Sequence, residues 1–169
     1  MIRYLGAALV IGGCGGFGFA MAAAQKREES QLRQLLRAIE FMECELQFRQ
    51  TPLPFLTENC ANLLRGSVSI LFSHLSELLK AHAYPDASAC MARAMAETAM
   101  LTPGCCEILR ELGQTLGQFD LPGQLRDLQA AAAQCRSKLS SLAENRESRM
   151  RSYQTLGLCA GATLAILLI

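Results

Sequence analysis

One face of the segment from Glu29 to Gln50 is apolar, and the opposite face is polar. Its apolar residues recur every three or four positions, at Leu32, Leu35, Leu36, Ile39, Met42 and Leu46. Because an α-helix has 3.6 residues per turn, this spacing places them on one side of an amphipathic helix. The segment is therefore expected to bury that side against other elements.

Proline and glycine divide the first half of the chain. The Thr51-Pro52-Leu53-Pro54 segment ends the first helix, because proline lacks an N–H donor and restricts the residue before it. A second helix is expected from Pro54 or Phe55 to near Arg65-Gly66, where Gly66 can adopt the left-handed conformation that ends helices. Ser67 is expected to cap a third helix that extends to Leu79.

Cap residues mark three more helices. Asp86 is expected to cap a fourth helix through about Leu101, and Thr102 followed by Pro103 opens a fifth. Asp120 opens a sixth, which no proline interrupts from Gln124 to Leu156 and which is expected to continue into the C-terminal segment. Six helices with short connections predict an all-α fold, an antiparallel helical bundle.

Charged residues are confined to the middle of the chain. Of the 16 basic and 15 acidic residues, only Arg3 lies outside residues 25–154. About 20 apolar residues in a helix cross a hydrocarbon core. We therefore expect an N-terminal transmembrane helix in residues 1–24, a helical-bundle domain in residues 25–152 and a C-terminal transmembrane helix in residues 153–169.

Basic residues flank both apolar ends on the side of the central domain. Lys26 and Arg27 follow the first end, and Arg149 and Arg151 precede the second. Because positive residues resist transfer across a membrane, the central domain is expected to be cytoplasmic. The alternative is an extracytoplasmic tail-anchored binding protein with a cleaved signal peptide, since Ala20–Ala24 resembles a cleavage site.

Each apolar end also carries a pair of glycines four residues apart. These pairs are Gly12 with Gly16 and Gly157 with Gly161. Small residues at this spacing let transmembrane helices approach closely. The glycines are therefore candidates for packing between membrane helices, although glycine is also common in such helices for other reasons.

The candidate chemistry is sparse. His74 and His82 are eight residues apart, which is not the spacing of zinc ligands on a helix. The adjacent thiols of Cys105 and Cys106 lie near a predicted helix N-terminus, which would suit a thiol oxidoreductase, but buried structural cysteines are the preferred interpretation. No metal, cofactor or enzymatic activity is expected. The balanced charges also give no sign of nucleic-acid binding.

Several segments together resemble the stage III sporulation protein AB family of endospore-forming bacteria. They are the residues from Gln34 to Glu40, the Thr51–Pro54 turn and the run from Ile108 to Gly117 with Asp120 and Gln124 after it. The resemblance covers essentially the whole chain. It departs in the fourth helix, where an aromatic residue is expected and this chain has Met91 and Met95.

The resemblance implies a non-enzymatic membrane platform or adaptor, similar to the cytoplasmic domain of the inner-membrane platform proteins of type II secretion and type IV pilus machines. It implies a place in the secretion-like channel complex of the mother-cell membrane around the forespore. The implied partners are the lipid bilayer, other membrane proteins of the complex and a cytoplasmic secretion-type ATPase, and self-association into a homo-oligomer is left open.

Exposed charges expected on the first helix are candidates for docking, although a solvated face is the default interpretation: Arg33, Arg37, Glu40 and Glu45. The residues that carry the family resemblance are further candidates: Gly113, Gly117, Asp120 and Gln124. Helix ending and capping explain all of these except Gln124.

The isolated segment 25–152 is expected to fold as a helical domain without metal or cofactor, because its apolar faces suffice for one core. Far-ultraviolet circular dichroism of this fragment checks the prediction. A spectrum of a disordered chain, or one with substantial strand, would contradict it.

Overall fold

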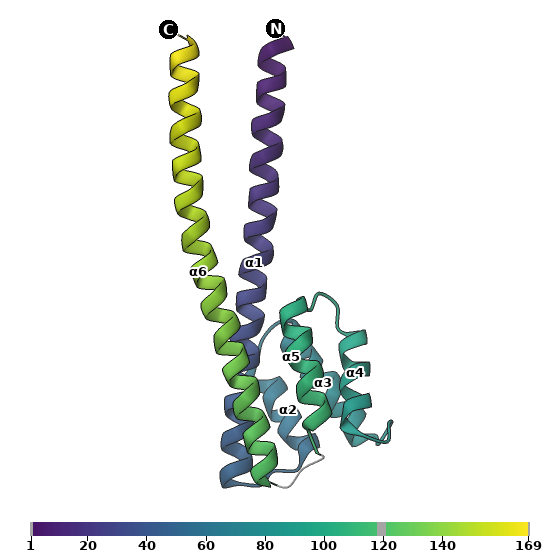
Figure 1. Ribbon diagram of the computed structural model, residues 1–169. Helices are drawn as coiled ribbons and strands as arrows, with labels where there is room; N and C mark the ends of the chain where they lie inside the picture. The colour runs from purple at the N-terminus through teal and green to yellow at the C-terminus, as the bar shows by residue number, and fades with distance from the viewer. Residues whose placement is uncertain (1, 118–120, 169) are drawn as a thin grey trace.

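The computed structural model consists of helices and connecting turns throughout the part that it describes (Figure 1). It describes the backbone of residues 2–117 and 121–168 and the side chains of residues 23–117 and 121–144. The helices are α1 (Ile2–Phe48), α2 (Leu53–Leu63), α3 (Ser67–Lys80), α4 (Ala87–Glu97), α5 (Pro103–Thr115) and α6 (Leu121–Leu168). The predicted all-α fold of six helices is therefore confirmed for these residues.

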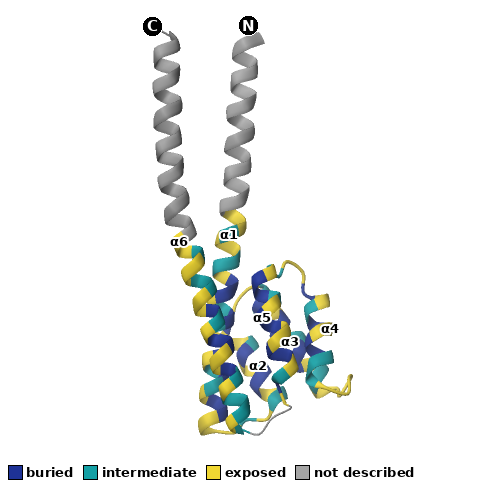
Figure 2. Cartoon of the chain, viewed as in Figure 1, coloured by how far each residue is buried: buried dark blue, intermediate teal, exposed yellow. Residues whose placement is uncertain are grey.

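The long helices α1 and α6 lie side by side, and α2 to α5 pack beside their lower halves in Figure 1. Helix α1 contacts α2, α3, α5 and α6, whereas α4 contacts only α3 and α5 among the described elements. Buried residues, coloured dark blue in Figure 2, are concentrated where α1 to α6 pack together. Helix α4 consequently lies at the edge of the bundle, because it contacts neither α1 nor α6 among the described elements.

The apolar face predicted for the first helix forms the centre of the core. Leu32, Leu35, Ala38, Ile39 and Met42 of α1 are all 0% exposed. Residues from every other helix complete this core, among them Leu56, Phe72, Met91, Ile108 and Leu128. Burial of a large apolar side chain contributes roughly 1.5–3 kcal/mol, so this face is the main source of cohesion in the bundle.

Three polar contacts hold α1 antiparallel to α6. Gln25 Nε2 donates to the carbonyl oxygen of Leu142 at 3.3 Å. Arg136 bonds Glu40 at 2.7 Å, and the Gln129 amide bonds Glu43 at 2.7 Å. Later residues of α1 thus contact earlier residues of α6. The N-terminal part of α1 and the C-terminal part of α6 therefore leave the bundle at the same end.

The membrane segments predicted for residues 1–24 and 153–169 lie outside the residues whose side chains are described, apart from Ala23 and Ala24. The same is true of Gly12, Gly16, Gly157 and Gly161. Within the described part of the chain, no helix combines the length and the apolar character needed to cross a bilayer.

The connection between α2 and α3 differs from the prediction. Helix α2 starts one residue early, at Leu53, and Gly66 precedes α3 instead of ending α2. Gly66 has φ +72°, a conformation that glycine adopts without steric cost, and Ser67 is the first residue of α3 instead of its cap. The short connection explains the difference, because one glycine reverses the chain and starts the next helix.

Asp86 caps α4 as predicted, since the backbone N–H of Ala89 donates to Asp86 Oδ1 at 2.7 Å. The helix ends at Glu97, however, and not near Leu101. The chain leaves the helix at Thr98, whose backbone is extended and whose hydroxyl donates to the carbonyl oxygen of Ala94 at 2.8 Å. Beyond this point Gln31 Nε2 of α1 donates to the carbonyl oxygen of Met100 at 2.7 Å. Gln31 Oε1 also accepts from the backbone N–H of Thr102 at 2.8 Å and from its hydroxyl at 3.0 Å.

Gly113 sets the distance between α5 and α4. It is buried, and a Cβ atom added there would lie 2.8 Å from both Cβ and Cγ of Met91. Such a separation is closer than carbon atoms tolerate, so the two helices can pack this closely only because residue 113 has no side chain.

Gly113→Ala is therefore expected to destabilise the bundle by about 1–2 kcal/mol, since the cost of overpacking exceeds the gain in helix propensity. The measurement is urea unfolding of the wild-type and variant chains, followed by circular dichroism.

Gly104→Ala in the same helix is the matched control. An added Cβ there meets the carboxylate end of Glu28, which can rotate away. We expect this variant to be less destabilised than Gly113→Ala. Equal effects of the two substitutions would show that the Met91 contact does not limit the packing.

Candidate functional site

The charged residues proposed for docking on the first helix have different surroundings. Arg33 is exposed and bonds Glu29 of its own helix at 2.8 Å. Glu40 is engaged by Arg136 of α6. Arg37 is exposed and has no hydrogen bond or ion pair with the residues that the structure describes. The three residues remain candidates for docking. Arg33 and Glu40 are each paired with another side chain, whereas Arg37 is not paired with any residue that the structure describes.

The expectation that Glu45 is exposed is wrong. Its side chain is only 11% exposed and lies 3.3 Å from Arg49. The hydroxyl of Thr51 donates to Glu45 Oε2 at 2.8 Å. The turn after α1 folds back over this carboxylate, so Glu45 stabilises the end of α1 instead of facing a partner.

The family-motif residues near the end of α5 have separable structural roles. Gly117 has φ +80° just after the helix, which agrees with the expected helix-ending role. Gly113 does not end the helix, because α5 continues to Thr115, and its role is the close approach to Met91. Gln124 is half-buried on α6, and Asp120 lies outside the described residues. A docking role for these residues stays a prediction.

Burial suppresses the acidity of three thiols. Desolvation raises the pKa of Cys60 and of Cys105 to about 12, and that of Cys135 to about 11. Cys106 is half-buried, and desolvation raises its pKa while the charge of Arg110 opposes the shift. A helix N-terminus can lower a thiol pKa, but at Cys105 burial dominates. The structure therefore gives no support to a nucleophilic thiolate at this position.

The two histidines do not form a site together. His74 is on α3, whereas His82 lies after the end of that helix, with φ +49°. Among the described residues no three His, Cys, Asp or Glu side chains are grouped closely enough to hold a metal ion.

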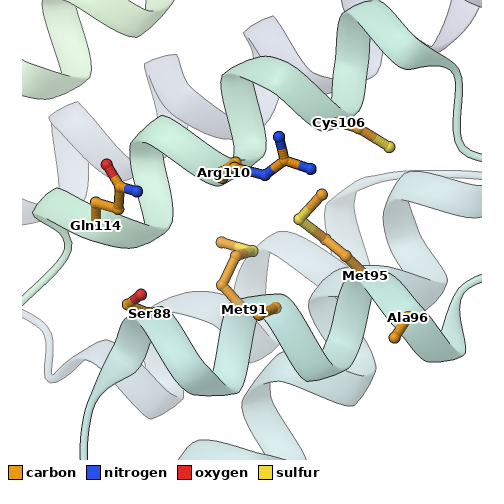
Figure 3. Close-up of a pocket in the computed structure, with 8 residues that line it drawn as sticks. Ser88, Met91, Met95, Ala96, Cys106, Arg110 and Gln114 are labelled. Atoms are coloured by element: carbon orange, nitrogen blue, oxygen red, sulfur yellow. The ribbon is translucent and has the colours of Figure 1, made fainter.

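A hollow of about 310 Å³ lies between α4 and α5 (Figure 3). Met91 and Met95 of α4 point toward α5, whose Cys106, Arg110 and Gln114 form the facing wall. The remaining lining residues are Ser88, Ala92 and Ala96. We call this feature the α4–α5 groove.

Sequence reasoning missed the α4–α5 groove. Its lining residues do follow helical spacing, four apart from Cys106 to Arg110 to Gln114 and from Met91 to Met95. That spacing shows which residues share a face. It does not show that two such faces stand opposite each other with space between them.

The described residues thus define a helical-bundle protein with an outer groove between two of its shorter helices. A model of the stage III sporulation protein AB family matches residues 3–169, so the chain belongs to this family. The predicted family is confirmed, and with it a role in sporulation.

Two relatives agree with this assignment. Stage III sporulation protein AB of Bacillus subtilis (strain 168) is 27% identical over 171 residues, covering all of both chains. A solved structure of stage III sporulation protein AB superimposes with a TM-score of 0.64 at 25% identity, covering 72% of this chain and 98% of the other.

The neighbouring thiols Cys105 and Cys106 are expected to react very differently with iodoacetamide at pH 8. At that pH a thiol of pKa about 12 is ionised in only about one molecule in 10,000, and Cys105 is also fully buried. Mass spectrometry of peptides from the native protein should find Cys106 and the exposed Cys44 alkylated and Cys105 intact.

Urea-unfolded protein is the control, since all of these thiols should then be labelled. If Cys105 of the folded protein reacted as fast as Cys106, the assigned burial would be incorrect and the thiol oxidoreductase hypothesis would regain support.

Proposed function

We propose that this protein is a non-enzymatic platform or adaptor of the membrane complex that joins mother cell and forespore during sporulation. Both apolar ends anchor it in the mother-cell membrane, and the bundle lies on the cytoplasmic side. There it docks other membrane proteins of the complex and a cytoplasmic secretion-type ATPase. Family membership supports the role in sporulation. The platform role, the mother-cell membrane and the ATPase are what the resemblance to the family implies, and the two anchors and their orientation are inferred from the apolar ends and their basic flanks.

The antiparallel pairing of α1 and α6 is the observation that carries this proposal. In the contact between Gln25 and Leu142, Gln25 directly follows the apolar N-terminal segment, and Leu142 precedes the charge-free C-terminal segment by 11 residues. Both ends therefore leave the bundle in the same direction. This geometry is what a domain held to one face of a membrane by two helices requires.

Exposed apolar side chains on three helices of the bundle suit contacts with partners. On α2 and α3, Phe55, Leu63 and Ile70 are each more than half exposed, and Phe48 at the end of α1 is 76% exposed. Lys80 lies 5.6 Å from the ring centroid of Phe55 and bonds Glu58 at 2.7 Å. Large exposed apolar groups with a charged rim are typical of protein-protein contacts.

Membrane attachment by both ends predicts a graded effect of deletions in sporulating cells. The full chain is expected to resist carbonate extraction from membranes. Deletion of residues 153–169 should leave attachment through the first anchor, and deletion of both ends should release the domain into the soluble fraction. Ile70→Glu, an exposed substitution outside the ends, is the control that should stay in the membrane.

Two further measurements in the same cells separate this proposal from its alternative. Co-purification with the tagged full chain should recover the secretion-type ATPase, and intact-mass analysis should find residues 1–24 retained. Loss of these residues would support the extracytoplasmic tail-anchored protein, and extraction of the full chain by carbonate would refute membrane anchoring.

A further inference from the structure

We propose that the α4–α5 groove binds an amphipathic helix of another protein, and that a carboxylate of this helix pairs with Arg110. The groove lies between two helices at the edge of the bundle, where α4 contacts only α3 and α5 among the described elements. This inference goes beyond the proposed function, because it depends neither on the membrane anchors nor on the ATPase.

The lining of the groove is suited to apolar side chains. Met95 is half-buried and presents a flexible, polarisable thioether, which adapts to differently shaped partners, and Met91 lines the inner part of the groove with only 1% of its surface exposed. Ala92 and Ala96 are exposed beside them and have minimal side chains. A partner backbone can therefore approach α4 closely while its apolar side chains fill the space against the methionines.

The charge of the groove selects an anionic partner. Arg110 is the charged member of the lining, next to the neutral polar groups of Ser88 and Gln114. It is exposed and has no hydrogen bond or ion pair with any described residue. A guanidinium binds a carboxylate through two parallel hydrogen bonds. An apolar partner would leave these N–H donors of Arg110 without an acceptor.

The dimensions favour a helix as the occupant. The wall from Ser88 to Ala96 covers eight residue steps of α4, which is about 12 Å or two helical turns. A partner helix places apolar residues one turn apart on such a wall and an acidic residue beside them. An extended strand is unsuited, because both walls are helices whose backbone groups are already bonded within the helix.

A second copy of this chain fits the groove less well than another protein does. Helix α2 carries the exposed Phe55 with Glu58 three residues later, which is the required combination. The Glu58 carboxylate, however, already bonds Lys80 at 2.7 Å. We therefore assign the groove to a different protein whose acidic residue has no partner within its own chain.

Site-specific photocrosslinking of the full chain in sporulating cells tests the proposal. Benzoylphenylalanine replaces Ala96 in the groove wall or, as the matched control, the exposed Ala130 of α6. We expect an adduct from position 96 and not from position 130, with the crosslink mapped by mass spectrometry to a helix that bears an acidic residue. An adduct with a second copy of this chain, or none at position 96, would overturn the proposal.

Charge exchange then tests the role of Arg110. A synthetic peptide of the mapped helix is titrated against the detergent-solubilised full chain by fluorescence anisotropy. Arg110→Glu should weaken binding by about 10- to 100-fold, Arg110→Lys should weaken it less, and Arg substituted for the acidic residue of the peptide should restore binding to Arg110→Glu. Unchanged binding to Arg110→Glu would refute the carboxylate contact.

These results are independent of the proposed function. Because Arg110 is exposed, its variants should keep the wild-type melting temperature and membrane fractionation. A negative result in the groove experiments would not contradict the proposed membrane anchoring. A negative result in the anchoring experiments would not contradict binding in the groove.

Discussion

The bundle depends on the burial of one face of α1. Five residues of this face, from Leu32 to Met42, are completely removed from solvent. Four of the five other helices contact α1, so each buries its own apolar face by lying against this helix or its immediate neighbours. A polar residue in this face would therefore disturb every layer of the core at once, since buried polar groups without partners cost free energy.

Polar contacts fix how the other elements sit on this central helix. Gln31, one residue before the apolar face begins, holds the connection between α4 and α5 through three hydrogen bonds. Glu40 and Glu43, on another side of α1, bond side chains of α6. Helix α1 thus supplies both the non-directional cohesion of the core and the directional contacts that set the positions of the connections.

The position of α4 follows from the same organisation and gives the molecule its outer groove. With no contact to α1, α4 is held by the Asp86 cap at its start, by its apolar side and by the close approach at Gly113. The helices are close at Gly113 and Met91, yet space remains beside the same methionine, where Ala92, Ala96 and Arg110 line the hollow. A peripheral helix pair of this kind can receive a partner without any rearrangement of the central core.

Much of the architecture was determined by the sequence itself, because helical spacing and caps act over one or two turns. The apolar face of α1, the Asp86 cap and the number of helices are all local properties of the chain, and each was predicted correctly. The family was likewise recognisable from short runs of residues. The membrane segments also follow from composition, and they remain predictions.

Tertiary structure decided whatever depends on contacts between distant residues. Periodicity placed Glu45 among the exposed charges, but a turn six residues later covers it. A glutamine in α1 bonds the connection between α4 and α5, and a methionine in α4 explains why residue 113 is glycine. The α4–α5 groove belongs to the same group, since it exists only where two separately predictable faces meet. The helical repeat assigns each residue to a side of its own helix, whereas only the packed neighbours decide whether that side is buried, bonded or left open.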